Sequence, residues 1–128
     1  MDLVRAYLDI WRVRMGERLR YTIEVPDTLR EVPFPPLLVQ PLVENALKHG
    51  LEPKIEGGEI LVRVEDRADG YRLMVADTGS GLQKDAISGI GLANVRERLE
   101  ALYDGNARLI LEDNQPSGLK VTMEIPHE

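Results

Sequence analysis

The stretch PLLVQPLVENALKHG, residues 36–50, combines a helical apolar pattern with regularly spaced polar side chains. Apolar residues recur in it every three or four positions, which predicts a helix with one face packed on a sheet. Lys48 and His49 follow Asn45 by three and four residues, so the helix would carry all three on one side. Gly50 is the expected residue after its last turn. The expected apolar face comprises Val39, Leu42, Val43, Ala46 and Leu47.

Pro41 interrupts the hydrogen bonding of this helix, because proline has no N–H to donate and its ring crowds the preceding turn. The sequence leaves two arrangements open. In one, the regular helix begins at Gln40, so that Pro41 stands in the first turn, where the missing N–H costs little. In the other, the helix lies within residues 36–49 and is kinked at Pro41.

The polar side of this helix has two interpretations. The amide oxygen of Asn45 is a hard ligand that suits Mg²⁺, a cation that keeps several waters and takes substrate phosphates as further ligands. Lys48, one turn on, would then reach a phosphate. Alternatively, Asn45, Lys48 and His49 form a solvated polar stripe beside a core face.

The remaining chain has the pattern of one amino-terminal helix, one strand and two hairpins. Leu3, Tyr7, Ile10, Trp11 and Met15 are at helical spacing, and Gly16 follows as the expected end of that helix. Alternating β-branched runs predict strands, and Asp69-Gly70 predicts the turn of the first hairpin. The expected strands are residues 20–25, 59–65, 71–76, 107–112 and 119–125, and a third helix passes through Leu92, Val95, Leu99 and Leu102.

This order of elements, in a chain of 128 residues, predicts a single domain. Strands that arrive as hairpins, with helices between them, favour a two-layer α/β sandwich. We expect a mixed, mostly antiparallel sheet of five strands with about three helices on one face.

Composition excludes several classes of protein. The chain has 16 Lys and Arg against 22 Asp and Glu, a formal charge of −6, which disfavours a general nucleic-acid binder. It contains no cysteine, so disulfides, thiolate metal sites and thiol catalysis are excluded. No apolar run approaches the ~18 residues of a membrane span, so we expect no direct contact of this domain with a membrane.

Two glycine-rich motifs follow the predicted helix at residues 36–50. Residues 77–81, Asp-Thr-Gly-Ser-Gly, come directly after a strand, where glycines let the backbone approach a ligand and a carboxylate can accept a hydrogen bond. Residues 89–94, Gly-Ile-Gly-Leu-Ala-Asn, open a helix whose free N–H groups form a phosphate cradle. The alternatives are a tight turn after a strand and ordinary glycines before a helix. Neither motif is a dinucleotide fingerprint or a Walker A motif.

Together, the three motifs resemble the N, G1 and G2 boxes of the GHKL ATP-binding fold, whose members include histidine kinases and gyrase-type ATPases. Residues 36–50 look like the PLLLQPLVENAIKHG signature of LytS-type sensor histidine kinases. Residues 89–99, GIGLANVRERL, resemble their GIGLxNVRxRL pattern. The resemblance extends from Tyr7 to the closing strand at 121–126 and implies the Bergerat fold.

This resemblance implies roles for residues of all three motifs. Asn45 would ligate a Mg²⁺ ion that bridges the ATP phosphates. Asp77 would accept a hydrogen bond from the adenine 6-amino group, and Gly79 and Gly81 would let the backbone close over the base.

The resemblance also implies a phosphate site and a lid. Gly89 and Gly91 would donate backbone N–H groups to the phosphates, with Leu92 beside them. Lys48 and His49 would lie near the phosphates, and Asn45 and Lys48 would take part in catalysis. Residues 82–88 correspond to a short ATP lid.

Two departures from the superfamily bear on the reaction. Members that hydrolyse ATP carry a glutamate one turn before the Mg²⁺ asparagine, where this chain has Pro41. Glu44 is the nearest carboxylate, but adjacent helix positions point about 100° apart. ATP hydrolysis as the main activity is therefore disfavoured.

LytS-type kinases also carry an upstream acceptor histidine, whereas this chain has only His49 and His127.

We accordingly expect residues 1–128 to be the isolated catalytic and ATP-binding domain of a histidine kinase, which cannot autophosphorylate alone. With ATP and Mg²⁺ it would phosphorylate a histidine on a separate dimerisation domain, and so act indirectly on a response regulator. The expected location is the cytoplasmic portion of a membrane-anchored receptor kinase. The alternatives are an anti-sigma-factor-type serine kinase of the same fold and a non-catalytic nucleotide-sensing or interaction module.

Five arginines lie near the amino terminus, and Asp9 and Glu17 among them offset part of their positive charge. One interpretation is a docking face toward the dimerisation domain, and the other is a solvated helix face. The arginines are Arg5, Arg12, Arg14, Arg18 and Arg20.

Overall fold

A computed structural model describes residues 2–29, 36–47, 57–68, 70–79, 90–114 and 118–126. The α-helices and strands follow one another along these residues in the expected order. The helical elements are α1 (Asp2–Met15), η1 (Gly16–Arg18), η2 (Asp27–Leu29), α2 (Pro36–Asn45) and α4 (Ile90–Tyr103). The strands are β1 (Leu19–Glu24), β2 (Gly58–Arg67), β3 (Gly70–Asp77), β4 (Arg108–Asp113) and β5 (Leu119–Pro126).

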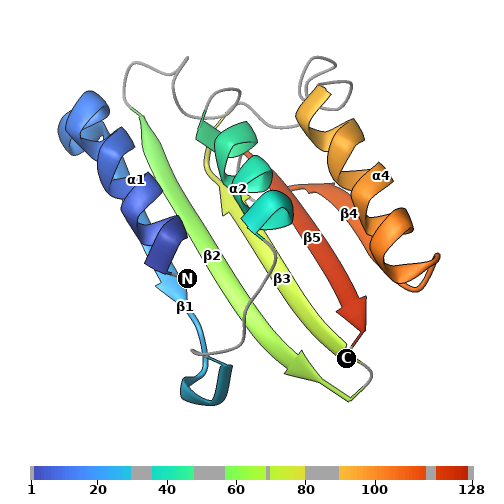
Figure 1. The fold of residues 1–128 in the computed structure, drawn as a ribbon. Helices are drawn as coiled ribbons and strands as arrows, with labels where there is room; N and C mark the ends of the chain where they lie inside the picture. Colours follow the sequence, from blue (N-terminus) through green and yellow to red (C-terminus); the bar gives the residue numbers. More distant parts are fainter. Residues whose placement is uncertain are drawn as a thin grey trace.

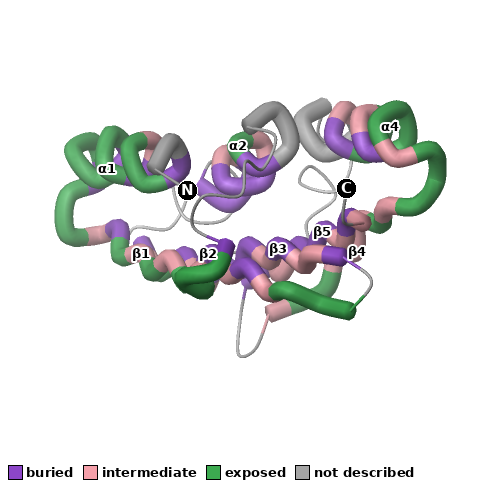
Figure 2. The backbone as a smooth tube through the Cα atoms, turned by 60° about the horizontal axis from the view of Figure 1, so that its bottom comes forward, coloured by how far each residue is buried: buried purple, intermediate pink, exposed green. Residues whose placement is uncertain are grey.

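The strands form one five-stranded sheet in the order β1-β2-β3-β5-β4. β1 pairs with β2 in parallel, and the other three pairs are antiparallel. α1, α2 and α4 all lie on one face of the sheet, which gives two layers (Figures 1 and 2). The expected mixed, mostly antiparallel sandwich is confirmed, and the strand ends differ from the expected ones by no more than one or two residues, as is usual for element boundaries.

The sheet places alternate residues on its two faces. In β2, Ile60, Val62 and Val64 are buried under the helices, because every second residue of this strand is apolar and β-branched. The intervening residues lie on the other face, where cross-strand ion pairs join register partners. Arg63 pairs with Glu24 at 2.8 Å. Further pairs are Arg20–Glu59 at 3.3 Å and Arg72–Glu124 at 2.8 Å.

The core is built almost entirely from aliphatic side chains between the helices and the sheet. The five residues expected on the apolar face of α2 are all buried, which confirms that prediction. The largest of the side chains with essentially no exposed surface are Leu8, Leu19, Leu42, Val43, Leu47, Ile60, Val62, Leu73 and Met123.

The structure decides between the two arrangements left open for Pro41. α2 begins at Pro36 and continues through Pro41 to Asn45, so proline lies inside the helix. A π-helical turn follows at residues 46–47. The helix keeps this course because its apolar side chains on both sides of Pro41 are buried in the core.

The expected amino-terminal helix is confirmed as α1, but Ile10 does not lie on its buried face. Its buried stripe is Val4, Leu8, Trp11 and Met15, whereas Ile10 is 68% exposed. Both stripes have helical spacing in the sequence, and packing on the sheet selects the one that buries Leu8.

The amino-terminal arginines contact neighbouring groups within the domain. The guanidinium carbon of Arg12 lies 5.8 Å from the centre of the Tyr21 ring, and that of Arg14 lies 5.1 Å from the centre of the Trp11 ring. The Tyr21 hydroxyl donates a hydrogen bond to Asp9, which raises the pKa of Tyr21. The contacts of Arg12 and Asp9 with Tyr21 join α1 to β1, whereas the Arg14 contact lies within α1.

Leu42 provides a direct test of this core. Because Leu42 is fully buried in α2, truncation to alanine should lower the free energy of unfolding by about 2–5 kcal/mol. Leu102→Ala is the matched control, since Leu102 is 60% exposed, and its effect should stay within about 0.5 kcal/mol. Urea denaturation measures both, and equal losses would contradict the placement of α2.

Candidate functional site

The described parts of the three sequence motifs lie toward one end of the sheet. Figure 1 places the last turn of α2, the arrowhead of β3 and the start of α4 toward this same end. α2 also packs against α4. Asn45 is the last residue of α2, Asp77 is the last residue of β3, and Gly91 lies in the first turn of α4. Segments distant in sequence therefore combine into one candidate site.

Asp77 is a buried carboxylate at the centre of this end, with only 1% of its surface exposed. Its Oδ1 accepts hydrogen bonds from the backbone N–H of Gly79 at 2.8 Å and of Leu119 at 3.4 Å. Burial of a carboxylate is costly unless donors compensate for its lost hydration. These two donors compensate part of that cost and hold the carboxylate in one orientation.

The chain that leaves β3 is attached to β2 immediately after Asp77. The Thr78 N–H donates to the carbonyl oxygen of Glu59 at 3.1 Å. The Glu59 N–H donates in return to Thr78 Oγ1 at 2.9 Å. Asp77 therefore lies between Ala76, which is paired within the sheet, and Thr78, which is bonded to β2.

Gly118, immediately before β5, approaches the main chain of Asp77 closely. A Cβ atom at position 118 would lie 1.8 Å from the Asp77 carbonyl oxygen. The residue also has φ +106°, a conformation that side chains other than glycine rarely adopt. Glycine is required here for both reasons.

Asn45 is buried, with 8% of its surface exposed. Pro41 lies one turn earlier in the same helix and is half-buried, so that position supplies no carboxylate beside Asn45. Glu44 is half-buried as well, on a neighbouring side of the helix.

Asn45 would hold a metal ion only together with a bound nucleotide, whose phosphates would also coordinate the ion. The residues that the structure describes contain no group of three or more His, Cys, Asp or Glu side chains that could hold a metal ion. A single amide oxygen fits Mg²⁺, because this cation keeps several waters and takes nucleotide phosphates as ligands.

The structure tests only part of the expected phosphate site. Gly91 and Leu92 are the second and third residues of α4, so the predicted helix opening after residue 89 is confirmed. Backbone N–H groups in such a first turn have no partner within the helix. Lys48, His49, Gly50, Gly81, Gly89 and the lid residues 82–88 lie outside the described residues, as does His127.

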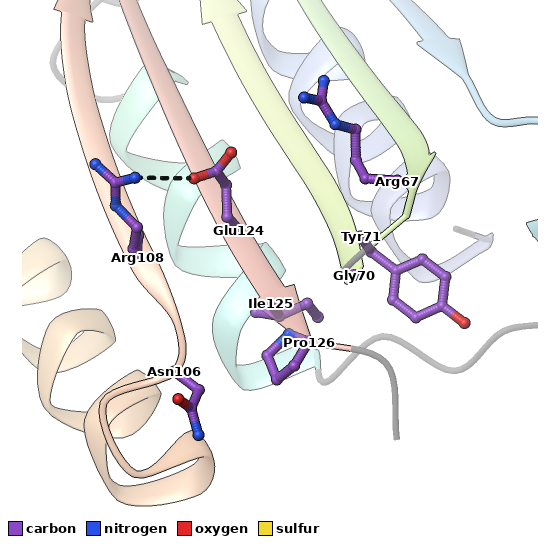
Figure 3. Close-up of a pocket in the computed structure, with 8 residues that line it drawn as sticks. All are labelled: Arg67, Gly70, Tyr71, Asn106, Arg108, Glu124, Ile125 and Pro126. Atoms are coloured by element: carbon purple, nitrogen blue, oxygen red, sulfur yellow. Dashed lines mark ion pairs between the residues drawn. The ribbon is translucent and has the colours of Figure 1, made fainter.

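One hollow lined by described residues lies away from this candidate site. It has about 150 Å³ and includes Gly70, Arg108, Glu124 and Pro126 in its lining (Figure 3). Gly70 begins β3 and Asp77 ends it, so these ends are roughly 23 Å apart at ~3.3 Å per residue.

Another hollow, of about 310 Å³, lies on the sheet face opposite the helices. Its lining includes Glu59 and Arg63 and, next to Asp77, Thr78 and Asn114. The Glu59 and Arg63 side chains are paired with Arg20 and Glu24, respectively, so these two charges are compensated within the domain.

The contacts of Asp77 with the β4–β5 connection were not predicted from the sequence. Asn114 Nδ2 donates to the Asp77 carbonyl oxygen at 2.8 Å, in addition to the contacts of Gly118 and Leu119. The sequence predicts only a turn at residues 114–118, between the expected strands 107–112 and 119–125. Asparagine at the start of a turn is common, and no local signal shows that its side chain reaches β3.

Comparison with known proteins identifies the family. The profile described as Histidine kinase-, DNA gyrase B-, and HSP90-like ATPase matches residues 36–128. The chain belongs to this ATPase family. Membership implies ATP binding, and the matched range contains all three motifs.

Curated relatives of this ATPase domain are sensor histidine kinases. The chain is 34% identical over 142 residues to the sensor histidine kinase/phosphatase LytS of Staphylococcus aureus, covering 100% of the chain and 24% of LytS. It is 32% identical over 130 residues to the sensor histidine kinase YesM of Bacillus subtilis, covering 98% of the chain and 22% of YesM. The chain thus spans about a quarter of the length of these relatives, in which the domain is part of a larger protein.

Solved structures share the fold of this ATPase domain. The catalytic domain of histidine kinase ThkA superposes with a TM-score of 0.73 at 18% identity, over 98% of this chain and 89% of that one. The histidine kinase domain of a blue-light activated kinase from Erythrobacter litoralis gives 0.72 at 20% identity, over 96% and 62% of the two chains. Among the described residues, no helix is long and apolar enough to cross a membrane.

Gly118 and Gly105 make a matched pair of substitutions. Both have positive φ, but a Cβ at Gly105 would meet nothing within 4 Å. Gly105→Ala should therefore cost about 1 kcal/mol of backbone strain. Gly118→Ala should cost about 1–3 kcal/mol more, because the methyl group displaces the Asp77 carbonyl. Thermal unfolding measures the difference, and equal costs would show that the close approach is absent.

Proposed function

We propose that this domain binds Mg-ATP at the site between α2, β3 and α4 and supplies its γ-phosphoryl group to a histidine on a separate dimerisation domain. The observation that carries the proposal is the buried Asp77 carboxylate, held by backbone donors where the three motifs meet. Family membership and the sensor-kinase relatives support ATP as the nucleotide.

Asp77 would recognise the base. A carboxylate held in one orientation is suited to accept a hydrogen bond from the adenine 6-amino group, whereas guanine presents a carbonyl oxygen at that position. Gly79, two residues further along the chain, is itself buried, and Gly81 would let the backbone approach the ring. The chemistry of recognition therefore favours adenine over guanine.

Asn45 would hold the metal ion with its amide oxygen, and the nucleotide phosphates would complete the coordination. The Mg²⁺ ion supplies neutralisation of the charge that develops on the phosphates. Asn45 contributes by positioning, because it is buried at the end of a helix whose apolar face is anchored in the core.

The start of α4 would receive the phosphates. Its first N–H groups, around Gly91 and Leu92, provide donors and a favourable helix dipole for an anion. Gly89, Lys48 and His49 are proposed to complete this phosphate site. Helix N–H groups and nearby basic side chains would bind the phosphates even though the domain carries a formal charge of −6.

Phosphoryl transfer to a protein suits this site better than hydrolysis. Pro41, one turn before Asn45, has no group that could deprotonate water. The nucleophile would come instead from a histidine in the dimerisation domain of a larger, membrane-anchored receptor kinase, whose cytoplasmic portion includes this domain. The phosphohistidine would then serve a response regulator.

Nucleotide titration tests the site. Asp77→Asn should weaken ATP binding about 10- to 100-fold with or without Mg²⁺, because a charge-assisted hydrogen bond is lost. Asn45→Ala should remove mainly the Mg²⁺-dependent part of the affinity. Calorimetry with ATP, in Mg²⁺ and in EDTA, measures both effects.

Asp104→Asn is the matched control for the charge change, because Asp104 is exposed in the turn after α4 and asparagine tolerates its φ of 52°. Its ATP affinity should equal that of the wild type. Absence of adenine nucleotide binding by the wild type at millimolar concentration would overturn the proposed site.

Transfer chemistry separates the kinase alternatives. The domain with [γ-³²P]ATP should label an added acceptor-histidine domain from the longer protein, and the product should be acid-labile, as a phosphohistidine is. An acid-stable product would favour the serine-kinase alternative. ATP binding without transfer to any acceptor would favour the non-catalytic module.

A further inference from the structure

We infer that Asn114, in the connection between β4 and β5, is a positioning residue that holds Asp77 for recognition of the base. This inference rests on the proposed role of Asp77 in nucleotide binding. It assigns part of the specificity of the site to a turn that contains none of the three sequence motifs.

Asn114 makes two hydrogen bonds that connect the β4–β5 turn with β3. Asn114 Nδ2 donates to the Asp77 carbonyl oxygen at 2.8 Å, and the Asn114 N–H donates to the Gly118 carbonyl oxygen at 2.9 Å. One residue therefore closes the β4–β5 turn and binds the main chain of β3. The side-chain contact is partly buried, so water competes with it only weakly.

Asp77 receives donors from two residues of the segment 114–119 at the end of the ladder. The β3–β5 register ends at Ala76 and Lys120, one residue before Asp77. Beyond it, the Leu119 N–H donates to the Asp77 carboxylate at 3.4 Å. The Asn114 amide donates to the carbonyl oxygen of the same residue, which is 1% exposed. With its carbonyl bonded to Asn114, Asp77 can accept the strand N–H at its carboxylate.

Both ends of Asp77 depend on the same short segment. Asn114 and Gly118 contact its carbonyl oxygen, and Leu119 contacts its carboxylate. Loss of the Asn114 amide would let the carbonyl accept from the Leu119 N–H, because Leu119 is opposite Asp77 when the β3–β5 register is continued by one residue. A shift of that donor would turn the carboxylate away from the base.

The matched variants are Asn114→Asp and Asn114→Ala, with Asn106→Ala as the control. Aspartate keeps the shape of Asn114 but replaces the N–H donor with an acceptor. Asn106 is exposed before β4, and its backbone N–H donates to the Tyr103 carbonyl oxygen at 2.9 Å, a bond that alanine keeps. Each variant is titrated with Mg-ATP, Mg-GTP and inorganic triphosphate.

Both Asn114 variants should lose about tenfold in ATP affinity, while their affinity for inorganic triphosphate stays within twofold. The ratio of ATP to GTP affinity should fall accordingly. In the Asp77→Asn background, Asn114→Ala should have no further effect on ATP affinity, because both changes act on the same hydrogen bond. A residue that only stabilises the turn would lower the melting temperature without changing the ratio.

Amide NMR of the nucleotide-free domain gives a readout that does not depend on ligand. The Gly79 and Leu119 N–H resonances should move in Asn114→Asp and stay in place in Asn106→Ala. If a variant is too unstable to study, the wild type suffices: the Asn114 side-chain N–H₂ resonances should shift with ATP and not with inorganic triphosphate.

The inference is overturned if the ATP-to-GTP ratio of the Asn114 variants stays within twofold of the wild type, or if the Gly79 and Leu119 amides do not move. Either outcome leaves ATP binding by the wild type intact. Failure of the wild type to bind ATP would instead refute the proposed function, and the amide shifts would still decide whether Asn114 positions Asp77.

Discussion

Burial of the apolar face of α2 against the sheet organises this domain. Five aliphatic residues of this helix and of the π-helical turn after it enter the core, and their burial keeps the helix continuous through Pro41. The same burial brings Asn45 to the end of the sheet where β3 ends and α4 begins (Figure 1). A binding site at this edge therefore follows from core packing, because the polar residues occupy the ends of elements whose interiors are anchored.

The buried Asp77 carboxylate is the second organising feature. A carboxylate with 1% exposure requires donors, and the domain provides them from the backbone of Gly79, just after β3, and of Leu119 in the neighbouring strand β5. Backbone donors are rigid, so the charge is held in place without a basic partner among these contacts. This arrangement suits an acidic domain that must still present an acceptor to a ligand.

Much of the fold was predictable because its signals are local. The alternation in β2, the spacing in α2 and the glycines before α4 each depend on near neighbours in sequence, and the structure has these elements where they were expected. Ile10 was not predictable, because two stripes of α1 have helical spacing and only contact with the sheet selects the one containing Leu8. The course of the helix at Pro41 depended on tertiary packing in the same way.

Residue type and spacing act over one or two helical turns or along one strand. They therefore specify the elements, their order and the motifs that place this chain among the ATPases. The surroundings of Asp77, in contrast, depend on tertiary structure. Asn114 lies 37 residues further along the chain, and the contact arises because β5 pairs with both β3 and β4. Pairing between distant strands fixes which side chains meet, and no local pattern encodes that register.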